Sequence, residues 1–168
     1  DLLSDYDGKV IYTDEMDALP FNESAVAPAI TQKSAFILLY TSGSTGVPKG
    51  VILEHGNLVA FCDYYRRYYK LTSDDKVSAY ASFGFDANMM DTYPALTTGA
   101  AVVIVPEELR IDLEALSNYL ADKQVTHSFM TTQVGYQFAI AYPTHPTLQH
   151  LSIGGEKLAP IDPPVSYK

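Results

Sequence analysis

Residues 35–50 read AFILLYTSGSTGVPKG, an uninterrupted apolar run that passes directly into a loop of glycine, serine and threonine. An apolar run of this length that ends in turn residues predicts a buried strand, followed here by a functional loop over residues 41–50. The loop offers what a polyphosphate needs: glycines that let the backbone approach, hydroxyl and N–H donors, and the single positive charge of Lys49. We therefore interpret this stretch as a phosphate-binding loop rather than as a surface linker of similar composition.

The order of residues at the end of this loop excludes the Walker type of phosphate loop. That motif needs Gly-Lys followed by Ser or Thr, whereas Lys49 follows Pro48 and precedes Gly50. Pro48 also disfavours a helix that starts at once, so the phosphates are expected on a loop and not on a helix N-terminus.

Four further apolar runs predict strands, and helical patterns lie between several of them. The runs cover residues 77–81, 100–105, 125–130 and 151–153. Alternation of strands and helices predicts an α/β fold with a mostly parallel sheet covered by helices. In such a sheet the ligand sites lie in the loops beyond the carboxyl ends of the strands.

Two helices are predicted in more detail. In the first, Asn57 is expected to cap a helix with aromatic residues three and four apart, which we interpret as core packing. These aromatic residues are Phe61, Tyr64, Tyr65, Tyr68 and Tyr69. The second helix is expected to begin near Asp112 and to bury one face that carries Leu113, Leu116 and Leu120.

Composition narrows the class of protein. The chain has 168 residues, 47% of them hydrophobic, which is enough for a packed core. Its net charge of −9 argues against nucleic acid or an anionic membrane as partner. With Cys62 as the only cysteine no intrachain disulfide is possible, which fits a cytoplasmic protein, and no run is long enough to predict a membrane span. The four histidines lack ligand spacing, so no metal site is predicted.

The first 33 residues differ from the rest. They are polar and acidic, are interrupted by Pro20 and Pro28, and hold one short candidate strand over residues 9–13. We expect residues 1–33 to be a connector packed on a missing part of the domain, and residues 34–168 to form a partial core.

The loop over residues 40–50 resembles the signature loop of the adenylate-forming superfamily, which includes peptide synthetase adenylation domains, acyl-CoA ligases and luciferases. The resemblance implies that this loop holds the β- and γ-phosphates of ATP, taken up with Mg²⁺, while a carboxylate attacks the α-phosphorus. Lys49 and Thr45 would be the catalytic residues. The residues that would bind the phosphates are Thr41, Ser42, Gly43, Ser44, Thr45, Gly46 and Lys49.

A second match distinguishes the branches of the superfamily. Residues 85–88, Phe-Asp-Ala-Asn, are similar to the Phe-Asp-x-Ser motif of nonribosomal peptide synthetase adenylation domains, whose aspartate pairs with the substrate's α-ammonium group. A lone carboxylate beside Phe83, Phe85 and Met90 would be costly to bury without such a cation. The alternative is that Asp86 only caps a helix that starts at Ala87. Asn88 stands where the family usually has serine, which leaves the local hydrogen bonding open.

A third match lies near the end, where residues 151–156 read Leu-Ser-Ile-Gly-Gly-Glu. The stretch resembles the family segment that contacts adenine and walls the amino-acid pocket. By this resemblance Gly154, Gly155 and Glu156 would face the nucleotide. The residues that would bind the amino acid are Asp86, Ala87, Met90, Phe129, Ser152 and Gly154.

The resemblance identifies residues 34–168 as part of the large N-terminal domain of an adenylation domain. It implies ATP-dependent formation of an aminoacyl-AMP and transfer to the phosphopantetheine thiol of a peptidyl carrier domain, with a condensation domain in the same assembly line. Later family segments, including a ribose-binding aspartate and a second catalytic lysine, are not found, so this stretch alone is expected to be inactive. A carboxylic acid:CoA ligase and a non-catalytic nucleotide-binding remnant remain as alternatives, and the amino acid cannot be read from the sequence.

Overall fold

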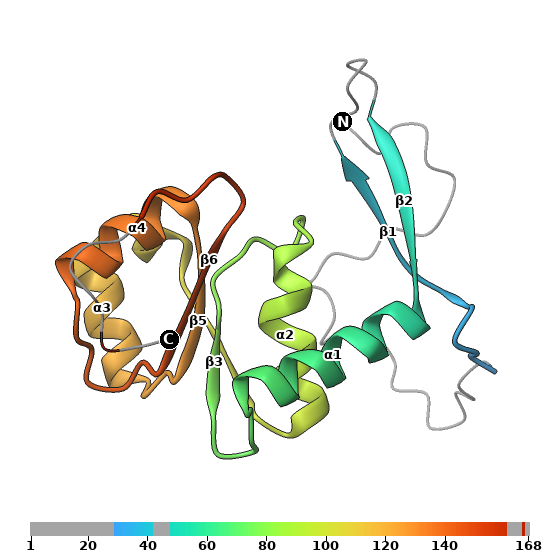
Figure 1. Cartoon of the computed structure of the whole chain (residues 1–168), viewed down its shortest axis with the longest axis horizontal. Coiled ribbons are helices and arrows are strands. Elements are labelled where there is room, and N and C mark those ends of the chain that lie inside the picture. The colour runs from blue at the N-terminus through green and yellow to red at the C-terminus, as the bar shows by residue number, and fades with distance from the viewer. Residues whose placement is uncertain (1–28, 42–47, 161–165, 167–168) are drawn as a thin grey trace, which may run out of the picture. The chain divides into compact units, whose positions relative to one another are not determined.

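A computed structural model of the chain describes residues 29–41, 48–160 and 166 (Figure 1). The chain divides into two units, residues 1–30 and 31–168, and every helix and strand below belongs to the second. The strand expected over residues 9–13 lies outside the described residues.

Four parallel strands form the main sheet of this unit. They are β3 (Lys76–Ala79), β4 (Ala101–Ile104), β5 (His127–Thr131) and β6 (His150–Gly154), in the order β4-β3-β5-β6. The four strands predicted from apolar runs are therefore confirmed, each to within a few residues.

Helices cover both faces of this sheet (Figure 1). α1 (His55–Tyr69) and α2 (Ala87–Thr98) pack on one face around a cluster that contains Tyr65, Val77 and Ala95. α3 (Leu113–Asp122) and α4 (Thr132–Ala141) pack on the other around a larger cluster that contains Leu116 and Phe138, and a short 3-10 helix, Glu107–Leu109, precedes α3. The α/β fold with a helix-covered parallel sheet is confirmed.

The predicted helix near Asp112 is confirmed as α3. Asp112 is its N-cap, and its side chain accepts a hydrogen bond from the backbone N–H of Ala115 at 3.0 Å. Leu116 and Leu120 are fully buried, because residues four apart lie on the same helix face and that face meets the sheet.

The prediction for α1 is partly wrong. The helix begins two residues earlier than Asn57, with Glu54 as N-cap, and Asn57 accepts a hydrogen bond from the Glu54 N–H at 2.9 Å. Tyr65 and Tyr69 join the core as expected, but Tyr64 and Tyr68 are exposed and stack on each other with ring centroids 5.6 Å apart. Five aromatic residues at these spacings span a wider arc than the face that meets the sheet, so the outer pair stays in solvent.

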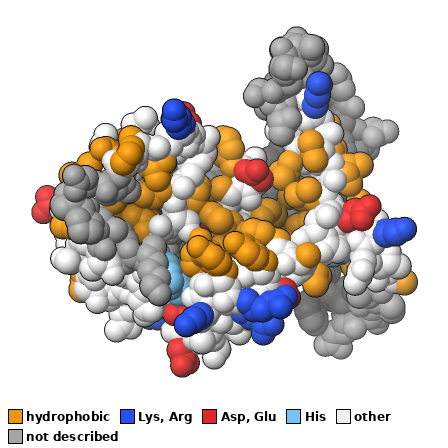
Figure 2. Space-filling view, in the orientation of Figure 1, with side chains coloured by type: hydrophobic (Ala, Val, Ile, Leu, Met, Phe, Trp, Pro, Cys, Tyr) orange, Lys and Arg blue, Asp and Glu red, His pale blue; other side chains and the backbone are white. Residues whose placement is uncertain are grey.

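The apolar run that opens the unit is a strand, but not a buried one. Among the residues that the structure describes, β1 (Ala35–Thr41) pairs only with β2 (Lys49–Glu54), antiparallel, in a separate two-stranded sheet. Leu38, Tyr40, Val51 and Ile52 are exposed on it, and hydrophobic side chains are visible on this part of the surface in Figure 2. Periodicity alone does not tell a buried strand from an uncovered apolar one, which is why this prediction was wrong.

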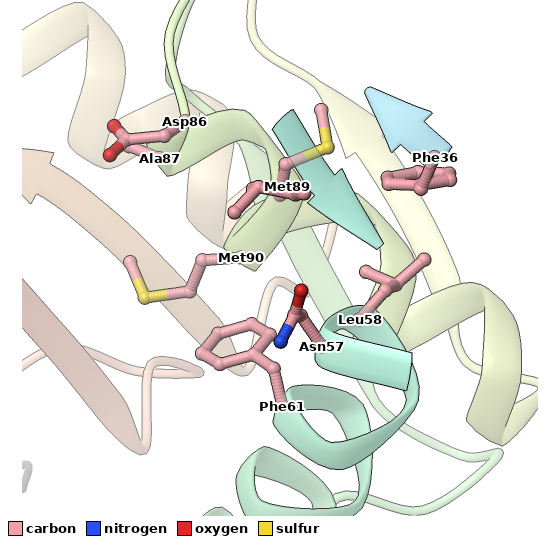
Figure 3. A pocket seen from close by; sticks show the side chains of 9 residues that line it. Phe36, Asn57, Leu58, Phe61, Asp86, Ala87, Met89 and Met90 are labelled. Atoms are coloured by element: carbon pink, nitrogen blue, oxygen red, sulfur yellow. The ribbon is translucent and has the colours of Figure 1, made fainter. Parts of the chain in front are cut away.

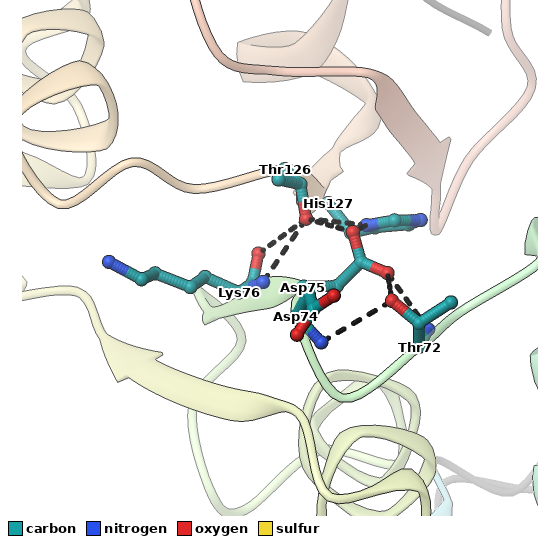
Figure 4. A network of polar contacts seen from close by, with 6 residues as sticks. All are labelled: Thr72, Asp74, Asp75, Lys76, Thr126 and His127. Atoms are coloured by element: carbon teal, nitrogen blue, oxygen red, sulfur yellow. Dashed lines mark hydrogen bonds and ion pairs between the residues drawn. The ribbon is translucent and has the colours of Figure 1, made fainter.

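A polar network ties the first residues of β3 and β5 together (Figure 4). These strands share a single register pair, Val77 with His127. The Thr126 hydroxyl donates to Asp75 at 2.9 Å and accepts from the backbone N–H of Lys76 at 3.1 Å, and it lies 2.8 Å from His127 Nδ1. The network supplies the cross-strand bonds that the short ladder lacks.

Candidate functional site

The main cleft opens beyond the carboxyl ends of the strands. The connection after β3 runs into α2 on one face of the sheet, and the connection after β5 runs into α4 on the other face. Loops that leave neighbouring strands in opposite directions open a crevice between them, the usual ligand site of such sheets. A cleft of about 670 Å³ lies there. It brings together six of the residues singled out from the sequence, namely Asp86, Ala87, Phe129, Gly154, Gly155 and Glu156.

Asp86 stands at the N-cap position of α2 but does not cap it. Its backbone is helical, with φ −59° and ψ −31°, and its side chain makes no capping hydrogen bond. The interpretation of Asp86 as a mere helix cap therefore loses its physical basis. The carboxylate is exposed, however, and not buried among Phe83 and Phe85 as expected, because both rings are themselves mostly exposed.

Two other residues singled out for amino-acid binding lie outside the main cleft. Met90 lines a separate pocket of about 400 Å³ with Phe61 and Leu58, on the α1 side of α2 (Figure 3). Asp86 and Ala87 line both pockets, and the Asp86 carboxylate points away from Leu58 in that view. The Ser152 hydroxyl lies 2.9 Å from the hydroxyl of Tyr69.

The turn after β6 has the geometry that its two glycines allow. Gly155 has φ +110°, a conformation that side chains rarely adopt. A Cβ on Gly154 would lie 3.4 Å from the Phe129 ring. Thr132, at the start of α4, holds the turn, since its hydroxyl accepts from the Glu156 N–H at 2.9 Å and lies 3.2 Å from the Glu156 carbonyl. Backbone groups of the turn are thereby fixed along one wall of the cleft.

The loop predicted to bind phosphate lies in the sequence between the paired strands β1 and β2. Thr41 ends β1 and pairs in register with Lys49, which begins β2, so residues 41, 49 and 50 belong to strands and not to the loop. Ser42, Gly43, Ser44, Thr45 and Gly46 lie outside the described residues. Lys49 is exposed and lines neither of the two pockets just described.

Sequence reasoning missed a buried acid beside the cleft. Asp91 is 1% exposed, and its Oδ2 accepts from the backbone N–H groups of Tyr80 at 2.9 Å and of Ala81 at 2.8 Å. Burial raises the pKa of Asp91 to about 7, although the two N–H donors and the nearby Arg110 oppose the rise. The only hint in the sequence is that Asp91 follows Asn88 by three residues, on one face of a helix.

Arg110 is a second residue that the sequence gave no reason to select. It lines the cleft, its carbonyl accepts from the Tyr80 hydroxyl at 2.8 Å, and its buried Nε has no hydrogen-bond partner within the described ranges. It brings a positive charge to a wall that otherwise consists largely of apolar groups and backbone.

Neither metal ligands nor a membrane span stand out among the residues that the structure describes. No group of three or more His, Cys, Asp or Glu side chains there could hold a metal ion. None of the described helices is long and apolar enough to cross a bilayer.

Comparison with known proteins gives consistent matches over most of the chain. A sequence profile of the family described as AMP-binding enzyme matches residues 3–162. Surfactin synthase subunit 2 of Bacillus subtilis (strain 168) is 36% identical over 159 residues, 91% of this chain. Bacitracin synthase 1 of Bacillus licheniformis is 41% identical over 121 residues, 72% of this chain. The aligned part is only 4% and 2% of those two proteins, respectively.

Solved structures are similar in fold. The Klebsiella oxytoca NpsA N-terminal subdomain in complex with 3-hydroxybenzoyl-AMSN matches with a TM-score of 0.70 and 26% identity, over 82% of this chain and 35% of that chain. The Vibrio cholerae adenylation domain AlmE in complex with glycyl-adenosine-5'-phosphate matches with a TM-score of 0.61 and 25% identity, over 71% of this chain and 23% of that chain.

Proposed function

The chain belongs to the family of AMP-binding enzymes, and from that premise we propose that the complete protein activates an α-amino acid as its adenylate. One carboxylate oxygen of the amino acid attacks the α-phosphorus of ATP. The bond from the α-phosphorus to the bridging oxygen breaks, and pyrophosphate leaves. The products are aminoacyl-AMP and pyrophosphate.

The observation that carries this proposal is the place of Asp86. The Asp86 carboxylate makes no capping hydrogen bond to α2. Asp86 lines the main cleft together with Phe129 and the turn at Gly154. A carboxylate held at the edge of a largely apolar cleft is suited to bind a cation, and the α-ammonium group of an amino acid is such a cation. A carboxylic acid without an amine has no positively charged group that could pair with the Asp86 carboxylate.

The nucleotide is proposed to lie along the turn after β6. Gly154 and Gly155 let its adenine approach the backbone, and Glu156 lies beside it. The hydroxyl and N–H groups of residues 41–46 and the charge of Lys49 would hold the β- and γ-phosphates, which arrive with Mg²⁺ as part of the substrate. Lys49 and Thr45 would stabilise the negative charge that develops on the leaving pyrophosphate.

The adenylate is proposed to pass to a carrier. The phosphopantetheine thiol of a peptidyl carrier domain attacks the carbonyl carbon of the adenylate, the bond to the phosphate oxygen breaks, and AMP leaves. A condensation domain of the same assembly line would then use the thioester. The similarity to surfactin and bacitracin synthases supports these partners.

The test is exchange of labelled pyrophosphate into ATP by the complete protein, with each amino acid in turn. We expect one amino acid, or a few of similar shape, to support exchange far above the background without amino acid. Equal exchange with the corresponding acid that lacks the amine would instead indicate a carboxylic acid:CoA ligase. Binding of ATP without exchange for any acid would indicate a nucleotide-binding remnant.

A further inference from the structure

Two side chains of α2 hold the chain where it leaves β3. Asp91 accepts the N–H groups of Tyr80 and Ala81 through one oxygen, at 2.9 and 2.8 Å. Asn88 donates from its side-chain amide to the carbonyl of Ala81 at 3.0 Å. Both polar groups of the Ala81 backbone are therefore bonded to side chains of one helix face.

This clamp, Asn88 with Asp91, closes the segment that carries Asp86. The segment starts at Ala81, which the clamp holds, and it ends at Asn88, which is the second residue of α2 and part of the clamp. Between them the chain makes two backbone turn bonds, Phe85 N–H to the Ser82 carbonyl at 3.0 Å and Asn88 N–H to the Phe85 carbonyl at 3.1 Å. Gly84 has no neighbour that a Cβ would meet within 4 Å, so little packing fixes the middle of the segment.

The direction of the Asp86 side chain thus depends on the clamp. Asp86 makes no capping bond of its own, and Phe83 and Phe85 on its N-terminal side are mostly exposed. A segment without apolar anchors keeps its conformation through its own turn bonds and through the bonds that fix its ends. The fixed ends lie at Ala81 and Asn88, where the two clamp residues are 1% exposed.

A carboxylate is a costly group for a purely structural role at this position. Removing it from water disfavours its charged form, and the raised pKa of Asp91 reflects that cost. An apolar side chain would fill the same space without the penalty, but it could not accept two backbone N–H groups. The cost is consistent with a requirement for the geometry that these bonds impose.

We propose that Asp91 and Asn88 are positioning residues, which hold residues 82–86 so that the Asp86 carboxylate meets the amine of the substrate. The clamp thereby sets the preference for an α-amino acid over the same acid without its amine. The sequence left open which hydrogen bond residue 88 makes, because the family usually has serine there. In this chain the Asn88 side-chain amide donates to the Ala81 carbonyl. The inference rests on the proposed function and adds residues that do not touch the substrate.

The experiment compares two substrates in the complete protein: the preferred amino acid and its desamino analogue. Their ratio of kcat/KM in pyrophosphate exchange is measured for the unaltered protein, Asp91→Ala and Asp91→Asn. We expect Asp91→Ala to lower this ratio about tenfold or more, because a displaced Asp86 weakens only the contact with the amine. Asp91→Asn keeps an oxygen that can accept both N–H groups, and we expect it to keep the ratio within about threefold.

Other results contradict the inference. An equal loss for both substrates in Asp91→Ala, or an unchanged ratio, would make Asp91 a general fold element. A loss of the ratio in Asp91→Asn as large as in Asp91→Ala would mean that the hydrogen-bond geometry is not the cause. If Asp91→Ala does not fold, Asn88→Ala replaces it, and an unchanged ratio there overturns the clamp.

Failure of the proposed function would look different. In that case the unaltered protein shows no exchange that depends on an amino acid, which contradicts both the proposed function and the inference about the clamp. If the unaltered protein shows normal amino-acid-dependent exchange, but a clamp variant keeps the same ratio of kcat/KM for the two substrates, only the inference about the clamp is contradicted.

Discussion

Lys49 is the residue whose proposed role depends most on charge. It is exposed at the start of β2, next to the loop that is proposed to hold the triphosphate. If its charge meets the leaving pyrophosphate, Lys49→Ala should lower the rate of adenylate formation by roughly 100-fold or more. Amino-acid binding should change far less, because the amine is met elsewhere. Single-turnover adenylate formation at saturating ATP, alongside equilibrium binding of the amino acid, measures the two effects separately.

The matched control for this substitution is Lys123→Ala. Lys123 is also exposed, but it directly follows α3 and is thus at the opposite end of β5 from the cleft. Its removal should leave both quantities unchanged. If Lys49→Ala forms adenylate at the unaltered rate, Lys49 is not a catalytic residue.

His127 should make the domain less stable in acid. It is buried against the rings of Tyr69 and His150, and burial together with His150 lowers its pKa, while Asp75 opposes the shift. A folded-state pKa below the unfolded value of about 6.5 means that the unfolded chain binds the proton first. The contribution to stability is therefore complete above about pH 6.5 and is lost as the pH falls from there through the lowered folded-state pKa.

The measurement is the unfolding midpoint of the complete adenylation domain between pH 5 and 8, for the unaltered protein and for His127→Gln. The difference between the two midpoints should shrink as the pH falls. Parallel curves, with a constant difference over this range, would show that His127 does not titrate on unfolding.

Single residues also show what the sequence could not supply. Asp86 was selected because it stands in a recognisable string, and the structure adds that its side chain is not engaged in capping. Asp91, Thr132 and Arg110 were missed, because each acts through a contact with a residue at least ten positions away. Such contacts leave no local pattern in composition or spacing.

At the scale of elements, α4 approaches β6 closely at Gly135. A Cβ on Gly135 would be 2.8 Å from Cγ1 of Ile153. Alanine is the better helix former by about 1 kcal/mol, but a β-branched neighbour on a strand cannot move away cheaply, and overpacking costs about 1–3 kcal/mol. We expect Gly135→Ala to be destabilising on balance.

Thermal or urea unfolding of the complete domain measures this balance. Gly84→Ala is the control, because no atom lies within 4 Å of the Cβ that it would add. The control should unfold within error of the unaltered protein. A more stable Gly135→Ala variant would mean that α4 can shift away from β6, and that helix propensity wins.

The parallel strands were predictable from sequence, whereas the hairpin was not. Runs at 77–81, 100–105, 125–130 and 151–153 are apolar because these strands have helices on both sides, and that pattern is visible without a structure. The run at 35–40 looks the same, yet β1 lies in a two-stranded sheet with Tyr40 70% exposed. What covers a strand is a property of the surrounding chain, not of the strand.

At the scale of the whole molecule, the 168-residue chain is expected to lack activity on its own. The chain spans about a third of the solved NpsA subdomain chain and a few per cent of the synthases that it resembles. Segments that the family uses for ribose and for a second catalytic lysine were not found in its sequence. We therefore expect the 168-residue chain alone to form no adenylate, because much of the electrostatic stabilisation of the transition state would be missing.

Mass-spectrometric detection of aminoacyl-AMP after long incubation with ATP and amino acids tests this expectation. The complete protein under the same conditions is the positive control. Adenylate formed by the 168-residue chain at a comparable rate would mean that this chain already contains the residues needed to stabilise the transition state.

The central claim is that Asp86 pairs with the amine of an α-amino acid, and the most direct measurement replaces it by alanine in the complete protein. Asp86 is exposed in the free chain, and a bound amino acid would shield the ion pair from water. Without the carboxylate, the shielded ammonium group loses this partner, at a cost on the order of 3–5 kcal/mol. The kcat/KM for the amino acid should then fall by about 100-fold or more, at tenfold per 1.4 kcal/mol, while that for the desamino analogue falls far less or rises. An equal fall for both substrates would contradict the claim and would make Asp86 a part of the fold rather than of the substrate site.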